Sequence, residues 1–150
     1  MKQGKATLRP VLVIDDSDDD LCLLRHVLTK AGVDNPLVSF DDSMEAQRYL
    51  QAALDPLQAE LIPCLVFTDL KIPRMNGIEL VSWARSIPLF DAVWFVMLST
   101  SQNDRDREAS RRAGADDYLI KFPPPEVFTS LISQANTTPR KPTCSADRGG

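Results

Sequence analysis

The stretch CLVFTDLKIPRMNG, residues 64–77, decides the fold of this chain, because an apolar run ends in it on a single carboxylate. Cys64 to Thr68 are rich in strand-forming residues, and Pro73 and Gly77 then break the chain before an amphipathic segment begins. A strand that stops at Asp69 presents that carboxylate at the carboxyl edge of a sheet, where ligands bind in open α/β sheets. The same residue also suits a turn that caps the next helix, so this stretch alone leaves both interpretations open.

Four more apolar runs predict strands, and the amphipathic segments between the runs predict helices. The strands are expected at 11–14, 37–40, 64–68, 94–98 and 118–120, and the helices at 18–31, 43–54, 77–86, 104–113 and 126–135. Because each strand is followed by a helix, we predict an α/β, flavodoxin-like fold. Its doubly wound, five-stranded parallel sheet has the order 2-1-3-4-5 and carries helices on both faces.

The length of 150 residues suits one domain. We expect an N-terminal extension at 1–8, a folded domain at 9–135 and a disordered tail at 136–150, where Thr, Pro, Arg and Gly are frequent. The formal net charge of -4 argues against nucleic-acid binding, which needs a basic face. No apolar run is long enough to span a membrane, and the scattered cysteines favour a reducing compartment, so the sequence predicts a cytoplasmic protein.

Polar side chains follow most of the predicted strands. The first strand ends in Asp15 and Asp16, the third in Asp69, the fourth in Ser99 and the fifth in Lys121. The carboxyl ends of parallel strands share one edge of the sheet, so we expect these side chains to lie together. Crowded carboxylates repel one another unless a cation neutralises them, and Mg²⁺ prefers such oxygen ligands. A hydroxyl and an ammonium group beside them indicate phosphoryl transfer onto or through Asp69.

One set of motifs runs through these strand ends and the loops next to them: Asp15-Asp16, Asp69-x-x-x-Pro73-x-x-x-Gly77, Ser99, Ala113-Gly114-Ala115, Tyr118 and Lys121. This set resembles the receiver domain of two-component response regulators. The resemblance covers about residues 9–135, and the spacings from Asp69 to Ser99 and to Lys121 match the family's pattern. It implies a response regulator that accepts a phosphoryl group from a sensor histidine kinase, and not an enzyme.

The resemblance also implies a role for each matching residue. Asp69 would be the phosphoacceptor. Mg²⁺ would be bound directly by Asp16, Asp69 and the backbone carbonyl of Lys71, and through water by Asp15. Ser99 and Lys121 would contact the phosphoryl oxygens, and Tyr118 would turn inward with them. The signal would then pass to the face formed by the helix at 104–113, the strand at 118–120 and the helix at 126–135.

Two positions depart from the family's pattern or extend it. The family usually has proline with a cis bond after the lysine, whereas Phe122 follows Lys121 here. A cis bond without proline costs roughly 3 kcal/mol, so the sequence leaves open a trans bond with a rebuilt loop or a cis bond. Lys71 adds a cation at the mouth of the site, and with Ser101 it lies where the family tunes dephosphorylation. We expect both residues to tune the lifetime of the phosphorylated state.

The expected partners follow from the same resemblance. The short tail implies a stand-alone receiver that signals through protein contacts. The connector at 55–63 and Ser99-Thr100-Ser101 are similar to stand-alone receivers that partner phytochrome-type photoreceptor kinases. The face named above would also mediate homodimerisation, with apolar contacts from Phe122, Val127, Phe128 and Leu131.

Two other functions fit the same fold. The first alternative is a phosphorylation-independent adaptor, which a rebuilt loop after Lys121 would favour. The second is a phosphatase of the haloacid-dehalogenase type, which also forms an aspartyl phosphate. That class needs a second aspartate two residues after the first, where this chain has Lys71. We therefore rank the phosphorylated receiver first.

Overall fold

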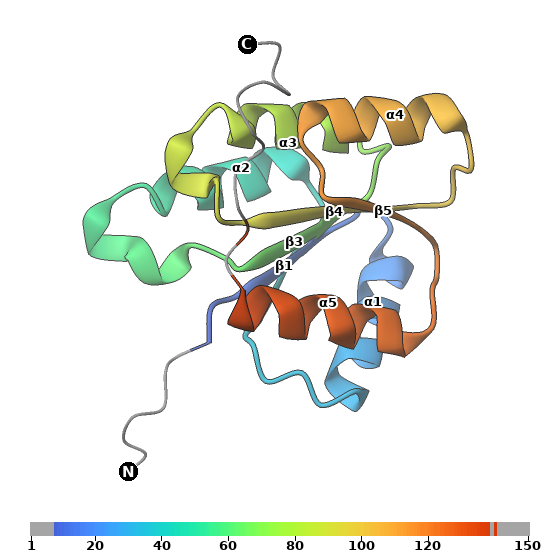
Figure 1. Ribbon diagram of the computed structural model, residues 1–150, viewed down its shortest axis with the longest axis horizontal. Coiled ribbons are helices and arrows are strands. Elements are labelled where there is room, and N and C mark those ends of the chain that lie inside the picture. Colours follow the sequence, from blue (N-terminus) through green and yellow to red (C-terminus); the bar gives the residue numbers. More distant parts are fainter. Residues whose placement is uncertain (1–7, 139, 141–150) are drawn as a thin grey trace.

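The structure is a computed structural model that describes residues 8–138 and 140. Strands and helices alternate along the chain, as predicted (Figure 1). The strands are β1 (Val11–Ile14), β2 (Leu37–Phe40), β3 (Leu65–Thr68), β4 (Trp94–Ser99) and β5 (Asp117–Ile120). The α-helices are α1 (Asp18–Lys30), α2 (Ser43–Ala52), α3 (Gly77–Arg85), α4 (Asp104–Ala113) and α5 (Pro125–Thr137), and short 3-10 helices form at η1 (Pro56–Leu61) and η2 (Pro88–Phe90).

The strands form one parallel sheet of order β2-β1-β3-β4-β5, which confirms the predicted topology. Its register brings the ends of the two central strands together, because Ile14 of β1 pairs with Thr68 of β3. The N–H of Asp69 donates to the carbonyl of Ile14 at 2.8 Å, so Asp15 and Asp69 leave the sheet side by side. The residues that follow paired strands therefore share one edge of the sheet.

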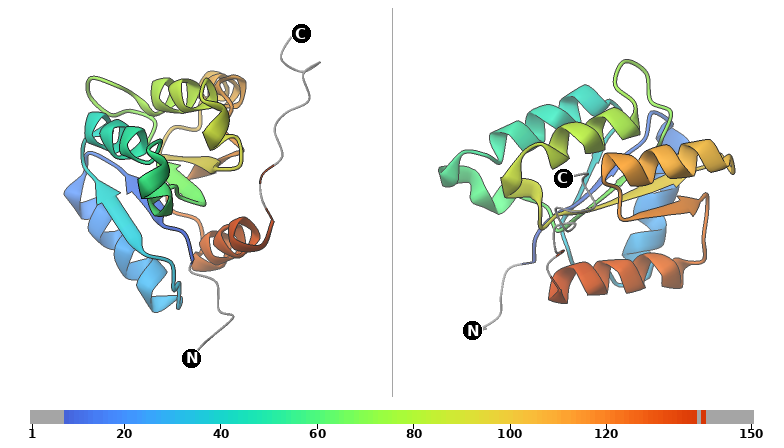
Figure 2. Two further views of the ribbon diagram at one scale, coloured as in Figure 1. Left: turned by 90° about the vertical axis from the view of Figure 1, so that its left-hand side faces the viewer. Right: turned by 45° about the horizontal axis from the view of Figure 1, so that its top comes forward.

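Helices cover both faces of the sheet. Val11 and Val13 of β1 pack with α1 and α5, whereas Leu12 and Ile14 pack with α2 and α3. Figures 1 and 2 show α1 and α5 on one face and α2, α3 and α4 on the other. A strand that is covered on both faces buries every side chain, which explains the continuous apolar run at 11–14.

Local signals position the helix ends. Ser17 caps α1, because its side chain accepts a hydrogen bond from the N–H of Asp20. Asn76 and Glu79 form a capping box at the start of α3. Gly114 ends α4 with a left-handed φ of 112°, a conformation that side chains with a Cβ rarely adopt.

Some details differ from the sequence-based expectation. The connector at 55–63 contains η1, and α2 ends at Ala52 instead of Leu54. Phe128, predicted at the dimer surface, is buried beneath the sheet, with its ring centroid 5.4 Å from that of Phe67. The apolar side of α5 therefore packs into the core, where the burial of an aromatic ring contributes most.

The chain at the end of α5 is held to the domain. The helix continues to Thr137, two residues further than predicted, and the amides of Asn35 and Asn136 exchange hydrogen bonds of 2.8 and 3.1 Å. Beyond the helix, Arg140 is buried and pairs with Asp116. The N-terminal extension up to residue 7 and the tail at 139 and 141–150 lie outside the described residues, so those two expectations remain predictions there.

Candidate functional site

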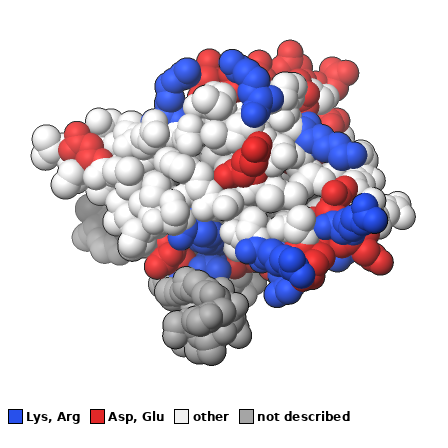
Figure 3. Space-filling view, turned by 90° about the horizontal axis from the view of Figure 1, so that it is seen from above, with Lys and Arg blue, Asp and Glu red and all other residues white. Residues whose placement is uncertain are grey.

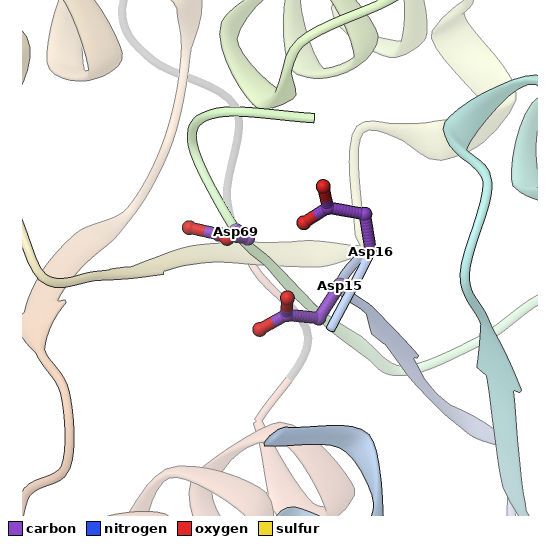
Figure 4. Close-up of side chains that lie close together, drawn as sticks. All are labelled: Asp15, Asp16 and Asp69. Atoms are coloured by element: carbon purple, nitrogen blue, oxygen red, sulfur yellow. The ribbon is translucent and has the colours of Figure 1, made fainter. Parts of the chain in front are cut away.

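Three carboxylates meet at the carboxyl edge of the sheet, where β1 and β3 end (Figure 4). Asp15, Asp16 and Asp69 each offer one oxygen, and these oxygens lie within 4.8 Å of one another. Asp15 is fully buried, Asp69 is partly buried and Asp16 is exposed. The arrangement follows from the register of β1 and β3, so the predicted convergence of these three residues is what the structure shows.

Backbone N–H groups orient the two less exposed carboxylates. Asp15 accepts a hydrogen bond from the N–H of Ser17 at 3.0 Å through its Oδ1 atom. Asp69 accepts one from the N–H of Leu70 at 2.7 Å, also through Oδ1. Each carboxylate is thereby fixed at the point where its strand turns into a loop, with the second oxygen directed into the site.

Lys121 binds the second oxygens of these carboxylates. Its Nζ lies 2.5 Å from Oδ2 of Asp15 and 3.4 Å from Oδ2 of Asp69. A third carboxylate, that of Asp20 in α1, lies 2.9 Å from the same nitrogen. The side chain of Lys121 is only 5% exposed, so this nitrogen is surrounded mainly by carboxylates. The reach of Lys121 from β5 to the ends of β1 and β3 agrees with its predicted place in the site.

Sequence reasoning missed Asp20. Acidic residues in the first turn of a helix are favoured by the helix dipole, and this reason applies to Asp18, Asp19 and Asp20 alike. The only distinguishing signal is position: Asp20 is the third residue of α1, one turn after the cap, and its side chain can reach back toward the strand ends.

Burial and charge act in opposite directions on the groups of the site. Burial and the neighbouring charge of Asp15 raise the pKa of Asp69, although Lys121 and the N–H of Leu70 oppose the rise. For Lys121, burial alone would lower the pKa, but hydrogen bonds to Asp15 and Asp20 and the charge of Asp69 outweigh it and raise the pKa. The site therefore combines a firmly protonated lysine with a carboxylate whose ionised form is disfavoured.

The donor set fits a hard divalent cation. Such ions take carboxylate and carbonyl oxygens as ligands, and the three clustered carboxylates supply oxygens from two adjacent strand ends. An ion there would also neutralise the repulsion that raises the pKa of Asp69. The side chain of Lys71 is exposed, so it does not fill the space between the carboxylates.

Ser99, Ser101 and Tyr118 form a chain of hydrogen bonds beside the site. The hydroxyl of Ser99 is buried and accepts from the N–H of Ser101 at 3.1 Å. The phenol of Tyr118 donates to the carbonyl of Ser101 at 2.9 Å, and its ring is buried, so Tyr118 points inward in this structure. Ser101 also donates through its hydroxyl to Asp106 of α4 at 2.6 Å. The loop after β4 is thus connected to α4 and to β5.

The peptide bond between Lys121 and Phe122 is cis, which is one of the two geometries that the sequence left open. The N–H of Lys121 donates to the carbonyl of Ser99 at 2.9 Å, so the β5 end stays paired with β4 up to the site.

A comparison with protein families identifies the family of this chain. The model of the response regulator receiver domain matches residues 11–133. This chain belongs to the receiver domain family. Receiver domains act in signalling as phosphoacceptors, and those of this type interact with histidine kinases.

Two relatives match this chain over most of their own length. The receiver is 27% identical to chemotaxis protein CheY1 of Helicobacter pylori over 122 residues, which cover 81% of this chain and 92% of CheY1. It is 29% identical to response regulator Rcp1 of Synechocystis over 111 residues, which cover 74% of this chain and 75% of Rcp1.

Solved structures share the fold. A response regulator Rcp1 in its Mn²⁺-bound form matches with a TM-score of 0.69 and 25% identity, over 90% of this receiver and 99% of that chain. Response regulator RPA3017, from red light signalling of R. palustris, matches with a TM-score of 0.75 and 25% identity, over 91% of this receiver and all of that chain. Within the described residues, no helix of the receiver combines the length and the apolar character that crossing a bilayer requires.

Proposed function

We propose that this receiver accepts a phosphoryl group on Asp69 from the phosphohistidine of a sensor histidine kinase, in a reaction that depends on Mg²⁺. The supporting observation is the placement of Asp69, which lies beside Asp15 at the sheet edge with its Oδ2 atom 3.4 Å from the ammonium group of Lys121. A carboxylate next to an ammonium group and a cation-binding cluster matches the needs of phosphoryl transfer, which relies on positioning and charge stabilisation.

The transfer forms one bond and breaks one. A carboxylate oxygen of Asp69 attacks phosphorus, the P–O bond forms, the P–N bond to the histidine breaks, and the imidazole keeps the electron pair and takes up a proton. The hydroxyl of Ser99 and the ammonium group of Lys121 then donate hydrogen bonds to the phosphoryl oxygens. Ser99 ends β4, which pairs with the strand before Asp69, and Lys121 follows β5, which pairs with β4.

The residues that would hold Mg²⁺ are Asp16, Asp69 and the backbone carbonyl of Lys71, with Asp15 acting through water. Both oxygens of Asp15 already accept hydrogen bonds, one from the N–H of Ser17 and one from Lys121, which favours an indirect role for Asp15. The ion would neutralise charge on the incoming phosphoryl group.

Phosphorylation would shift the population of two states of the face formed by α4, β5 and α5. The hydrogen bonds that join Ser99, Ser101 and Tyr118 support this proposal, since a movement of the Ser99 hydroxyl would change the carbonyl position of Ser101 that Tyr118 binds. Lys71 and Ser101, at the mouth of the site, would tune the lifetime of the acyl phosphate. An unchanged rate of dephosphorylation in Lys71→Ala would exclude that role for Lys71.

The partners proposed are a sensor histidine kinase of the phytochrome type and a second copy of this chain, in the cytoplasm. The similarity to a response regulator from red light signalling supports the first. For the second, Phe122 remains 39% exposed, and Val127 and Leu131 are partly accessible, whereas Phe128 is buried. The adaptor alternative depended on a loop that removes Lys121 from the site. It loses that support, because Lys121 lies among the site carboxylates.

The test is incubation of the purified protein with acetyl phosphate and Mg²⁺, followed by intact mass measurement. We expect the mass of one phosphoryl group to be added, and we expect no addition in Asp69→Asn or in the presence of a chelator. Absence of the addition in a folded wild-type protein would contradict the proposal, and so would an addition that persists in Asp69→Asn.

A further inference from the structure

The ammonium group of Lys121 is shared unequally among the carboxylates. Its two shortest contacts are 2.5 Å to Asp15 and 2.9 Å to Asp20, whereas Asp69 lies at 3.4 Å. A lysine ammonium group has three N–H donors. Asp69, the phosphoacceptor in our proposal, therefore has the longest of the three contacts with Lys121. Lys121 is nevertheless the residue that should later bind the phosphoryl group on Asp69.

Asp20 is free to make this contact because other groups complete the cap of α1. The hydroxyl of Ser17 accepts from the N–H of Asp20, and the N–H of Ser17 donates to Asp15. An acidic side chain at this third helical position commonly reaches back to the N–H of the cap residue. Since Asp15 already occupies that N–H, the Asp20 carboxylate is directed to Lys121 instead.

Asp15 and Asp20 differ in how easily they can release Lys121. The Asp15 side chain is 2% exposed, so it would remain without solvent if Lys121 moved away. The Asp20 side chain is 31% exposed, so water can replace the lysine there at little cost. Asp20 is therefore the partner from which Lys121 can be withdrawn reversibly.

We propose that Asp20 is a positioning residue of the phosphorylation site, which holds the Lys121 ammonium group away from Asp69 until a phosphoryl group draws it across. This inference rests on the proposed function of Asp69. Asp20 would thus oppose the phosphorylated state in two ways: it competes for Lys121, and it adds a negative charge next to an incoming anion. Removal of its charge should favour the phosphorylated state.

The first measurement compares Asp20→Asn with the wild type in binding beryllofluoride, a phosphoryl mimic, by calorimetry at Mg²⁺ concentrations shown to saturate each variant. We expect Asp20→Asn to bind about tenfold more tightly, the change that loss of one hydrogen bond to a charged group produces. The matched control is Asp19→Asn, which removes the same charge from the same helical turn at an exposed position that makes no ion pair with Lys121. Equal affinities of the two variants would overturn the proposal.

The second measurement needs neither metal nor phosphoryl mimic. In a metal-free crystal structure of Asp20→Asn, we expect Nζ of Lys121 to lie within hydrogen-bond distance of Oδ2 of Asp69, closer than the present 3.4 Å. A Lys121 that stays at its present distance would also overturn the proposal. If the wild type does not bind beryllofluoride at all, the proposed function fails, whereas the metal-free position of Lys121 still decides the role of Asp20.

Discussion

The two edges of the sheet each contain a cluster of buried ion pairs, and the two clusters differ in charge balance. At the carboxyl edge, Asp15, Asp20 and Asp69 surround Lys121, and Asp16 lies close by. At the amino edge, Asp116 lies between the guanidinium groups of Arg85 and Arg140, at 3.0 and 2.5 Å. One cluster has a surplus of negative charge, and the other has a slight surplus of positive charge.

The amino-edge cluster is complete in its hydrogen bonds. Arg85 also donates to the carbonyls of Gly114 and Phe90, and Arg140 donates to the carbonyl of Asp91. The Oδ2 atom of Asp116, which accepts from Arg85, also accepts a hydrogen bond from the N–H of Phe95. This cluster joins α3, the start of β5 and the chain after α5, and within the described residues none of its buried side-chain polar atoms lacks a hydrogen-bond partner.

The difference indicates which cluster serves stability and which serves binding. In a closed cluster with nearly balanced charge, removal of any one partner leaves a buried charge without compensation and destabilises the fold. In a cluster with a surplus of like charge, repulsion destabilises the free protein, and this stability is restored when a cation binds. Perturbed carboxylates in a partly open position are typical of functional sites. Removal of one carboxylate charge from each cluster should therefore change stability with opposite signs.

The largest effect is expected from Asp116→Ala. It leaves Arg85 and Arg140 without their shared carboxylate, and burial already lowers the pKa of Arg85 to about 10 even with Asp116 present. Breaking a buried pair by removing one partner costs about 3–5 kcal/mol, so the free energy of unfolding in urea should fall by about that amount. Asp117→Ala, at the exposed neighbouring position, is the control. Equal midpoints for the two variants would show that the cluster does not stabilise the fold.

A second substitution, Gly77→Ala, tests the carboxyl edge by crowding. A Cβ at Gly77 would lie 2.4 Å from the backbone carbonyl oxygen of Asp69, so the loop that starts at the site must shift. We expect a loss of about 1–3 kcal/mol in the free energy of unfolding, as for overpacked positions, and slower modification by acetyl phosphate. Gly32→Ala is the matched control, since nothing lies within 4 Å of its Cβ position although its φ of 84° adds local strain. Normal modification of Gly77→Ala would show that the loop tolerates the shift.

Asp69→Asn should have the opposite sign to Asp116→Ala. It removes a carboxylate whose ionised form is disfavoured by burial and by the charge of Asp15. In a buffer with a chelator at pH 7, the variant should therefore be more stable than the wild type, by on the order of 1 kcal/mol. Chemical denaturation with and without Mg²⁺ provides the measurement.

The pH dependence of that difference has a definite sign. Because the pKa of Asp69 is raised in the folded state, protonation favours folding, and the wild type gains stability relative to Asp69→Asn as the pH falls through this pKa. The difference in the free energy of unfolding between Asp69→Asn and the wild type should therefore become smaller in acid. Added Mg²⁺ should stabilise the wild type and leave Asp69→Asn nearly unchanged. If Asp69→Asn were less stable than the wild type without Mg²⁺, repulsion among the carboxylates would not destabilise the carboxyl edge.

The smallest effect is expected on α4, where ion pairs are exposed. Figure 3 shows acidic and basic side chains interspersed toward the right, where α4 lies. Glu108 contacts Arg111 and Arg112, and hydrogen bonds from these two residues lower the pKa of Glu108 to about 2. Water screens such pairs, so Glu108→Gln should unfold at the same urea concentration as the wild type at pH 7. A clear loss of stability would mean that the number of ion pairs, and not their burial, separates the two edges.

Much of the site was readable in the sequence, because it depends on strand ends. An apolar run buried on both faces has a definite end, and parallel strands bring such ends to one edge. The sequence therefore placed Asp15, Asp16 and Asp69 together, and with them Lys121. The start of α1 after Ser17 and the end of α4 at Gly114 also depend on local signals, since a capping side chain or a left-handed residue acts within one turn.

Only the tertiary structure decided the contacts between segments far apart in the chain. Asp20 and Lys121 are separated by 101 positions, and nothing in the first turn of α1 distinguishes a residue that binds Lys121 from one that faces solvent. Arg140 binds Asp116 across 24 positions, in a segment whose composition predicted disorder. Phe128 faces the core because α5 packs on β3 with that side inward. Such contacts depend on how helices dock on the sheet, which side-chain packing determines and local sequence pattern does not.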